Sequence, residues 1–232
     1  MSSLNKSVFL SCEHASNAIP DYLSAKFQND SAQEILKTHR GYDIGALEVF
    51  FALQKILAPK FSIAGKFSRL AIDLNRNSNR NHRFSEFSED EPLEIKQKLK
   101  EYFNEYRGNF LQSIKNELEN PNAEILHLSI HSFTPELNGE IRNADLGILY
   151  DPSRKEESAL AKKIQKNLIL IAPDLRVRKN YPYQGKNDGL TTALRKIFPP
   201  EKYIGFEIEM NQAYLQKISP QKMAGILMES LF

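Results

Sequence analysis

The stretch "EILHLSIHS" (residues 124–132) is an apolar run with polar side chains at its end. Its first seven residues, Glu124–Ile130, predict a buried β-strand, because leucine and isoleucine dominate a run too short for a typical helix. Two similar apolar runs occur elsewhere. Val8–Cys12 is followed by Glu13 and His14, and Tyr203–Met210 contains Glu209 near its end. Strands that are apolar along their whole length are typical of parallel sheets covered on both faces.

The rest of the chain supplies the helices and shorter strands of such a fold. Apolar residues at helical spacing predict the helices Asp43–Leu57 (Asp43 as N-cap), Pro92–Leu118, Lys155–Ile171, Leu190–Ile197 and Ser219–Leu231 (Ser219 as N-cap). The further predicted strands are Arg69–Asn75, Leu146–Tyr150 and residues 175–178. Their alternation predicts one α/β domain over residues 1–232, with a central mixed, largely parallel β-sheet flanked by helices.

The composition excludes several classes of protein. Of the 232 residues, 41% are hydrophobic and 26% charged, and the formal net charge of +2 is too small to predict a nucleic-acid partner. The polar segment Asn75–Pro92 turns from basic to acidic and predicts a surface loop. The single cysteine, Cys12, excludes an internal disulfide. No signal-peptide pattern and no apolar run of about 20 residues occur, so we expect a cytoplasmic protein that binds no membrane.

Chemically capable side chains follow the ends of four predicted strands. In an open α/β sheet, ligands bind beyond the carboxyl ends of the strands. The side chains found there are Glu13 and His14, then Asp73, Asn75 and Arg76, then His131, and finally Glu209 and Asn211. We therefore expect one functional site at this edge of the sheet.

The two histidines of the central run, His127 and His131, are spaced like the ligands of a helical zinc site. In a strand they would lie about 13 Å apart, which is too far for a shared metal. We expect His131, at the strand end, to belong to the site, and His127 to be a hydrogen-bonded core residue. His39 and His82 lie in loop-like contexts and are predicted to be surface residues.

A catalytic zinc needs about three protein ligands and an open position. His14 and His131 would supply two nitrogens, and the third ligand would be a carboxylate, Asp43 or Glu13. Neighbouring strand residues point to opposite faces, so Glu13 shares a metal with His14 only if the chain turns sharply. We expect one Zn²⁺ held by His14, Asp43 and His131, with Glu13 as the alternative.

The proton transfers of a hydrolysis require a carboxylate or an equivalent base. Glu209 at the end of the last strand is the predicted base, and Glu207 on the same face is the alternative. A different chemistry would use Cys12 as a thiolate nucleophile activated by His14. The apolar run before Cys12 favours a small buried residue instead.

Cationic side chains are predicted to bind the substrate. Arg69 would stabilise a developing oxyanion, and Arg76, oriented by Asn75, would bind a carboxylate through two hydrogen bonds. Asp73 would hold one of these guanidinium groups. Arg142 is either a second carboxylate clamp or an exposed turn residue.

Five motifs together resemble the N-formylglutamate amidohydrolase family. They are "CEHASNAIP", "GYDIGA", "SRLAIDLNR", "LSIHSFTP" and "FEIEMNQAYL", in the family's order, and they span about residues 7–215. The resemblance implies a phosphorylase/hydrolase-like fold similar to zinc carboxypeptidases, with Glu209 as the motif glutamate. It also implies a zinc-dependent hydrolase that releases formate from a small N-acyl amino acid such as N-formylglutamate.

The sequence departs from the family pattern in two places. Glu13 and Ala15 flank His14, where the family more often has proline and glycine, and Gln212 stands where an arginine is more usual. Two alternatives are a non-catalytic protein of the same fold that binds a small carboxylate, and a zinc carboxypeptidase-like peptidase. The retained order of His, Arg, Asn-Arg, His and Glu favours the amidohydrolase.

Overall fold

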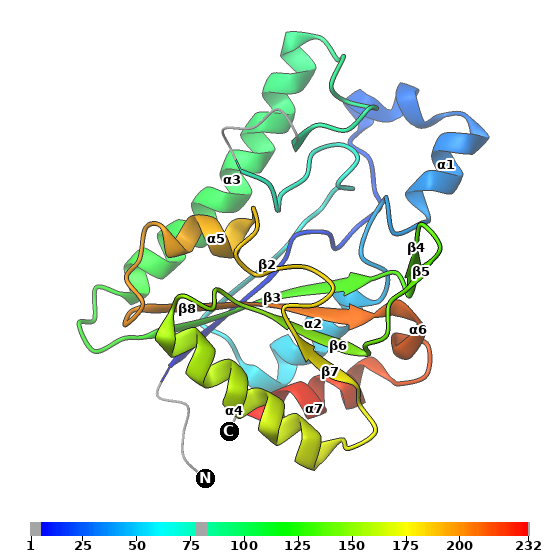
Figure 1. Ribbon diagram of the computed structural model, residues 1–232. Coiled ribbons are helices and arrows are strands. Elements are labelled where there is room, and N and C mark those ends of the chain that lie inside the picture. The colour runs from blue at the N-terminus through cyan, green and yellow to red at the C-terminus, as the bar shows by residue number, and fades with distance from the viewer. Residues whose placement is uncertain (1–5, 78–82, 232) are drawn as a thin grey trace.

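Six strands form one sheet in the order β2-β1-β3-β8-β6-β7 (Figure 1). The computed structural model describes residues 6–77 and 83–231. Four strands run parallel: β1 (Ser7–Cys12), β2 (Phe61–Ala64), β3 (Ile125–Phe133) and β8 (Tyr203–Asn211). The remaining two, β6 (Leu146–Leu149) and β7 (Val177–Lys179), run the opposite way. The predicted mixed, largely parallel α/β sheet is confirmed.

Helices cover both faces of the sheet and enclose two apolar cores (Figure 1). One face carries α2 (Ala46–Leu57), α4 (Lys155–Ile171) and α7 (Pro220–Leu231). The other carries α3 (Leu93–Glu117), α5 (Leu190–Arg195), η1 (Asp21–Phe27) and α1 (Asp30–Leu36). A short hairpin, β4 (Glu136–Leu137) with β5 (Glu140–Ile141), follows β3, and α6 (Gln212–Leu215) follows β8. Among the described residues, no helix is both long and apolar enough to cross a bilayer.

The strands β3 and β8 form the centre of the sheet. Each has nine residues, all buried, and they pair in parallel along their whole length. Because the register places His131 opposite Glu209, these two side chains are neighbours on one face. The predicted strand Glu124–Ile130 is three residues too short at its end, so His131 lies within β3 and not beyond it.

The predicted strand Arg69–Asn75 is wrong, because this segment forms turns. Its apolar residues are buried, but the Ser68 hydroxyl accepts from the Leu70 amide at 3.1 Å, and the Ser68 carbonyl accepts from the Ala71 amide at 2.9 Å. Burial therefore comes without strand pairing. The place beside β1 is taken by Phe61–Ala64, which was not predicted.

Two predicted helix starts have different outcomes. The helix predicted from Asp43 begins at Ala46, after Gly45 in the left-handed conformation (φ 83°), so Asp43 is not its N-cap. Ser219 does cap α7, because its hydroxyl accepts from the Lys222 amide at 3.2 Å. The predicted surface loop Asn75–Pro92 is only partly described, and His82 lies outside the described residues.

Candidate metal centre and pocket

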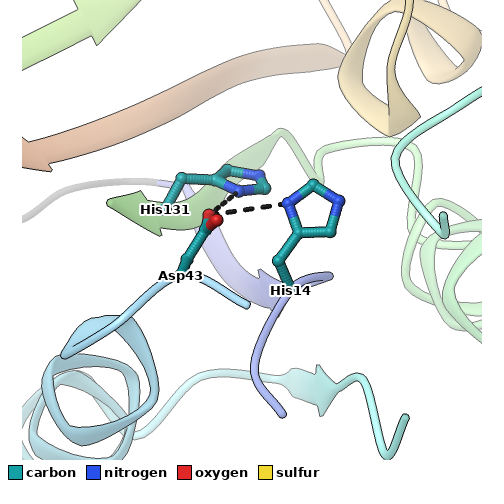
Figure 2. Close-up of side chains that lie close together, drawn as sticks. All are labelled: His14, Asp43 and His131. Carbon is teal, nitrogen blue, oxygen red and sulfur yellow. Dashed lines mark hydrogen bonds and ion pairs between the residues drawn. The ribbon is translucent and has the colours of Figure 1, made fainter. Parts of the chain in front are cut away.

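Three separate segments bring His14, Asp43 and His131 together (Figure 2). His14 lies in the turn after β1, Asp43 precedes α2, and His131 lies in β3. All three are buried, and the nearest ligand atoms of the three side chains lie within 4.8 Å of one another. The three side chains therefore meet at the carboxyl edge of the parallel strands, where a site was expected.

One oxygen of Asp43 lies between the two imidazole rings (Figure 2). Its Oδ2 atom lies 2.8 Å from Nδ1 of His131 and 3.5 Å from Nδ1 of His14. The same oxygen accepts from the backbone amide of Ser132 at 3.3 Å. Both histidines thus direct the same ring nitrogen toward the same carboxylate.

The outer nitrogens of the two rings also face carboxylates. Nε2 of His131 lies 3.0 Å from Oε2 of Glu13, and Nε2 of His14 lies 2.6 Å from Oδ1 of Asp73. The Ser129 hydroxyl donates to Oε2 of Glu13 at 2.6 Å. Metal-binding histidines usually have such a partner on the nitrogen that does not bind the metal. Glu13 is placed on this outer side, so Asp43 is the carboxylate that faces both rings.

Charge interactions within this group shift the pKa values in opposite directions. Burial opposes the charged form of His131, but hydrogen bonds to Asp43 and Glu13 and their negative charges raise its pKa well above the ordinary value. Burial likewise opposes ionisation of Glu13, yet the hydrogen bond and charge of His131 hold the pKa of Glu13 well below its ordinary value. The pKa of Asp43 is also lowered against burial, by the charges of Arg69 and His14 and by hydrogen bonds to both histidines. The carboxylates therefore stay ionised, as metal ligands and their partners must.

The donor set fits a catalytic metal. Two imidazoles and one carboxylate are a known ligand set of catalytic zinc, and the buried group His14, Asp43 and His131 could bind such an ion. Both outer nitrogens are already oriented by carboxylates, which fixes the ring positions before any ion binds.

A cavity of about 180 Å³ opens over this group. Its lining includes eight of the residues considered from sequence: His14, Asp43, Arg69, Asn75, Arg76, His131, Glu207 and Glu209. It also includes five that were not predicted: Ser132, Tyr183, Gln184, Asn187 and Asp188. Four of these five belong to the loop between β7 and α5. Its turn-rich sequence, "YPYQGKNDG", predicts a loop but does not show where that loop lies.

The two glutamates of β8 differ in their partners. Oε1 of Glu207 accepts from the Thr191 hydroxyl at 2.7 Å. In the described part of the chain, Oε2 of Glu209 is buried without a hydrogen-bond partner. Burial raises the pKa of both, and that of Glu209 to about 8. Glu209 is thus a carboxyl group poised to exchange a proton near neutral pH.

The three predicted cations differ in their positions relative to the pocket. Arg69 is in close contact with the His14 ring, and its Nη1 lies 3.5 Å from Oδ1 of Asp43. Arg76 is exposed and pairs with Asp73 at 3.3 Å. Arg142 is not part of the pocket lining, and its guanidinium lies 5.1 Å from the ring centre of Tyr183 at the mouth.

The amide of Asn75 links two parts of the site. Its Oδ1 accepts from the Leu190 amide at 2.7 Å, at the start of α5. Its Nδ2 lies 3.5 Å from Nε2 of His131. Asn75 thus connects the loop after β2 to the start of α5 and to His131.

Two further residues considered from sequence lie outside this site. Cys12 is fully buried, burial raises the pKa of its thiol well above the ordinary value, and it does not line the pocket. This environment does not suit a thiolate nucleophile. His127 is a hydrogen-bonded core residue, as expected: its Nε2 lies 2.7 Å from the Ser11 hydroxyl and its Nδ1 2.6 Å from that of Tyr203.

Comparison with known proteins places the chain in a family. Residues 6–215, which are most of the chain, match the N-formylglutamate amidohydrolase family. The chain belongs to this family. The predicted resemblance is therefore confirmed, and N-formylglutamate amidohydrolases are enzymes that hydrolyse an amide. No protein in the curated set matches the chain.

Solved structures with the same fold include one that carries the family's name. The gene product Atu2144 from Agrobacterium tumefaciens superposes with a TM-score of 0.78, at 25% identity, over 97% of this chain and 89% of that one. The N-formylglutamate amidohydrolase from Ralstonia eutropha JMP134 superposes with a TM-score of 0.65, at 13% identity, over 97% and 92%. The second likeness shows that the fold is shared.

Proposed function

We propose that this member of the family is a zinc-dependent hydrolase that cleaves the amide of a small N-acyl amino acid. The substrate would carry an N-formyl group, as in N-formylglutamate, and the products would be formate and the free amino acid. The observation that carries the proposal is the arrangement of His14 and His131. Each directs Nδ1 to Asp43 and Nε2 to an outer carboxylate, which is how histidine ligands of a metal are usually held.

In this proposal His14, Asp43 and His131 hold the ion, and Glu13 and Asp73 orient the two rings. A divalent metal held there would supply Lewis acidity, which makes water a nucleophile at neutral pH and polarises the acyl oxygen. Proton transfer and substrate binding would be carried out by the protein's own side chains.

Glu209 is the proposed proton carrier. Its Oε2, which has no hydrogen-bond partner among the described residues, would accept a proton from the attacking water and return it to the departing amide nitrogen. Its raised pKa supports this role, because a group that carries protons in both directions works best near the ambient pH. Glu207 is the weaker candidate, since one of its oxygens is already bound by Thr191.

The cations would orient the substrate. Arg69, beside His14 and Asp43, is close enough to the centre to stabilise negative charge on the acyl oxygen. Arg76, with Asn75 beside it in the lining, would bind the carboxylate of the amino acid. Arg142 at the mouth would attract the anion as it approaches.

The size of the cavity supports a small substrate over a peptide. About 180 Å³ is less than the roughly 300–1,000 Å³ of pockets that bury drug-sized ligands. A formylated amino acid is a ligand of suitable size, whereas a peptide substrate would need an open groove.

The test is acid release by the zinc-loaded full chain from a panel of formyl- and acetyl-amino acids, including the glutamate derivatives. Wild type should release formate, and Glu209→Gln should lose about 10²–10⁴-fold in kcat while it keeps its zinc. Glu207→Gln is the matched control and should lose far less. If substrates bind but no acid is released, the protein is a carboxylate-binding protein and the proposal fails. If Glu207→Gln alone is inactive, the base is assigned wrongly.

A further inference from the structure

Tyr183 lines the pocket with a phenol ring. It belongs to the loop between β7 and α5 and is 43% exposed, so it lies where the cavity meets solvent. No sequence motif marks it. It takes no part in the metal group or in the proposed proton transfer.

The backbone on either side of Tyr183 is held firmly against the sheet. A Cβ atom on Gly147 of β6 would lie 1.9 Å from the carbonyl oxygen of Tyr181, so the loop passes directly over that glycine. The side-chain oxygen of Asn180 accepts from the amides of Tyr150 and Gly185, at 3.0 and 3.1 Å. The loop is therefore a fixed support for the tyrosine ring.

The far end of the loop is held as well. Oδ2 of Asp188 accepts from the backbone amide of Asn77 at 2.9 Å. Gly189 packs so closely that a Cβ atom would lie 2.9 Å from Oδ1 of Asn75 and 3.0 Å from Oε1 of Glu207. The segment that carries Tyr183 is thus held against β6 at one end and against the pocket residues Asn75 and Glu207 at the other.

Arg142 holds the ring from outside. Its guanidinium carbon lies 5.1 Å from the ring centre of Tyr183 and 5.9 Å from that of Phe133, within the range of cation–π contacts. Phe133 is the last residue of β3, two positions after His131. Phe133 also meets Tyr181 edge to face, with ring centres 6.5 Å apart at 89°. These contacts connect Tyr183 at the pocket entrance to β3, the strand that carries His131.

The proposed function defines which part of the substrate meets this ring. The acyl carbon must lie near His14, Asp43 and His131, the amide nitrogen near Glu209, and the carboxylate near Arg76. The side chain of the amino acid is the part left to occupy the outer cavity, where Tyr183 forms the wall.

We propose that Tyr183, held in place by Arg142, is a specificity-determining residue that limits the size of the amino-acid side chain accepted by the pocket. The proposal rests on the proposed function for the orientation of the substrate. The ring, and not the hydroxyl, is the part that excludes large side chains. Arg142 acts through Tyr183 and is a positioning residue.

The test compares N-formylalanine with N-formylphenylalanine on the zinc-loaded full chain. In Tyr183→Ala, the ratio of kcat/KM for the phenylalanine substrate over the alanine substrate should rise about 10–100-fold, mostly through KM. Tyr183→Phe should keep the wild-type ratio. Arg142→Gln should shift the ratio in the same direction as Tyr183→Ala, but less, and Arg142→Lys should restore part of it. The matched control is Tyr22→Ala, since Tyr22 is another exposed tyrosine with a cation, Lys98, 5.7 Å from its ring, but it lies outside the pocket.

A binding measurement separates this inference from the proposed function. Calorimetric titration of both formyl-amino acids into Glu209→Gln, with and without Tyr183→Ala, needs no turnover. If Tyr183→Ala changes the ratio of the two Kd values, the proposal that Tyr183 limits the size of the side chain is supported, even if wild type releases no formate. An unchanged ratio in Tyr183→Ala, an equal shift in Tyr22→Ala, or a shift in Tyr183→Phe as large as in Tyr183→Ala would overturn it.

Discussion

His127 and His131 lie four positions apart on β3, on the same face and almost completely buried, at 0% and 2% exposure. His127 is surrounded by the hydroxyls of Ser11 and Tyr203 and by the ring of Phe110. His131 is surrounded by the carboxylates of Asp43 and Glu13. Burial lowers the pKa of His127 to about 3, whereas the carboxylates raise the pKa of His131 well above its ordinary value.

The difference shows that neighbours, and not burial, decide what a buried histidine does. Neutral hydroxyls can accept a hydrogen bond from one nitrogen of a neutral imidazole and donate one to the other. Both hydrogen-bonding groups of the buried His127 ring therefore have partners. Two carboxylates favour a positive charge at His131, whether that charge is a proton or a metal ion. The following predictions test this contrast, from the largest expected effect to the smallest.

Replacing His131 should remove the metal, and replacing His127 should not. His131→Gln removes one of three proposed ligands, and we expect loss of bound zinc and a decrease in amide hydrolysis of at least about 10⁴-fold. His127→Gln, the matched control, should keep zinc at wild-type stoichiometry. Metal content of the purified variants, measured by atomic emission, checks both. If His131→Gln retains zinc, His131 is not a metal ligand and the proposed difference between the two histidines is wrong.

The stability of the wild type should decrease in acid partly because of His127. The pKa of this residue is lowered from 6.5 to about 3, so the unfolded chain binds the proton more readily. Its contribution is fully present above pH 6.5 and is lost as the pH falls toward 3, by up to about 5 kcal/mol. Urea unfolding of metal-free wild type and His127→Gln between pH 7 and pH 4 measures it. The free energy of unfolding should fall more steeply with decreasing pH in wild type than in His127→Gln. Equal slopes would contradict the lowered pKa of His127.

Weakening the outer partner of His131 should lower metal affinity without removing the site. Glu13→Gln takes away a negative charge but keeps a group that can accept from Nε2. We expect a 10–100-fold weaker zinc affinity, measured by competition with a chromogenic chelator. Tyr203→Phe removes a hydroxyl partner of His127 and is the control. Equal effects of the two substitutions would mean that the environment of His131 is not special.

Removing the Tyr203 hydroxyl should cost stability alone. Tyr203→Phe leaves Nδ1 of His127 without its partner at 2.6 Å, and we expect a loss of about 1–2 kcal/mol in the free energy of unfolding. Zinc affinity and hydrolysis should stay at wild-type values. Denaturant unfolding together with the chelator assay checks both. A change in zinc affinity would show that the two histidines are coupled through β3.

Much of the fold follows from residues that report burial and periodicity. The long apolar runs around Leu128 and Phe206 predict central strands, and the helical spacing from Pro92 to Leu118 predicts α3 closely. The strand prediction for Arg69–Asn75 is wrong for a physical reason. Its apolar residues indicate that it is buried, but burial is equally satisfied by turns closed by the Ser68 side chain.

The site was predictable where a strand end delivers the side chain, and less so elsewhere. His14, His131 and Glu209 follow from the rule that ligands bind at the carboxyl edge. The choice between Asp43 and Glu13 depends on the turn after Cys12, which lets Glu13 reach the far side of the His131 ring. Tyr183 could not be placed from sequence, because the loop that carries it crosses β6 only where Gly147 leaves room.

The strand order has a consequence for synthesis of the protein. Of the six strands of this sheet, β8 is the last in chain order, yet it lies in the interior, between β3 and β6. A nascent chain without it has two sheet fragments, each with an open edge that invites pairing with another chain. The proposed base, Glu209, is carried on this same strand. A chain that lacked β8 would therefore lack both the closed sheet and the proposed proton carrier.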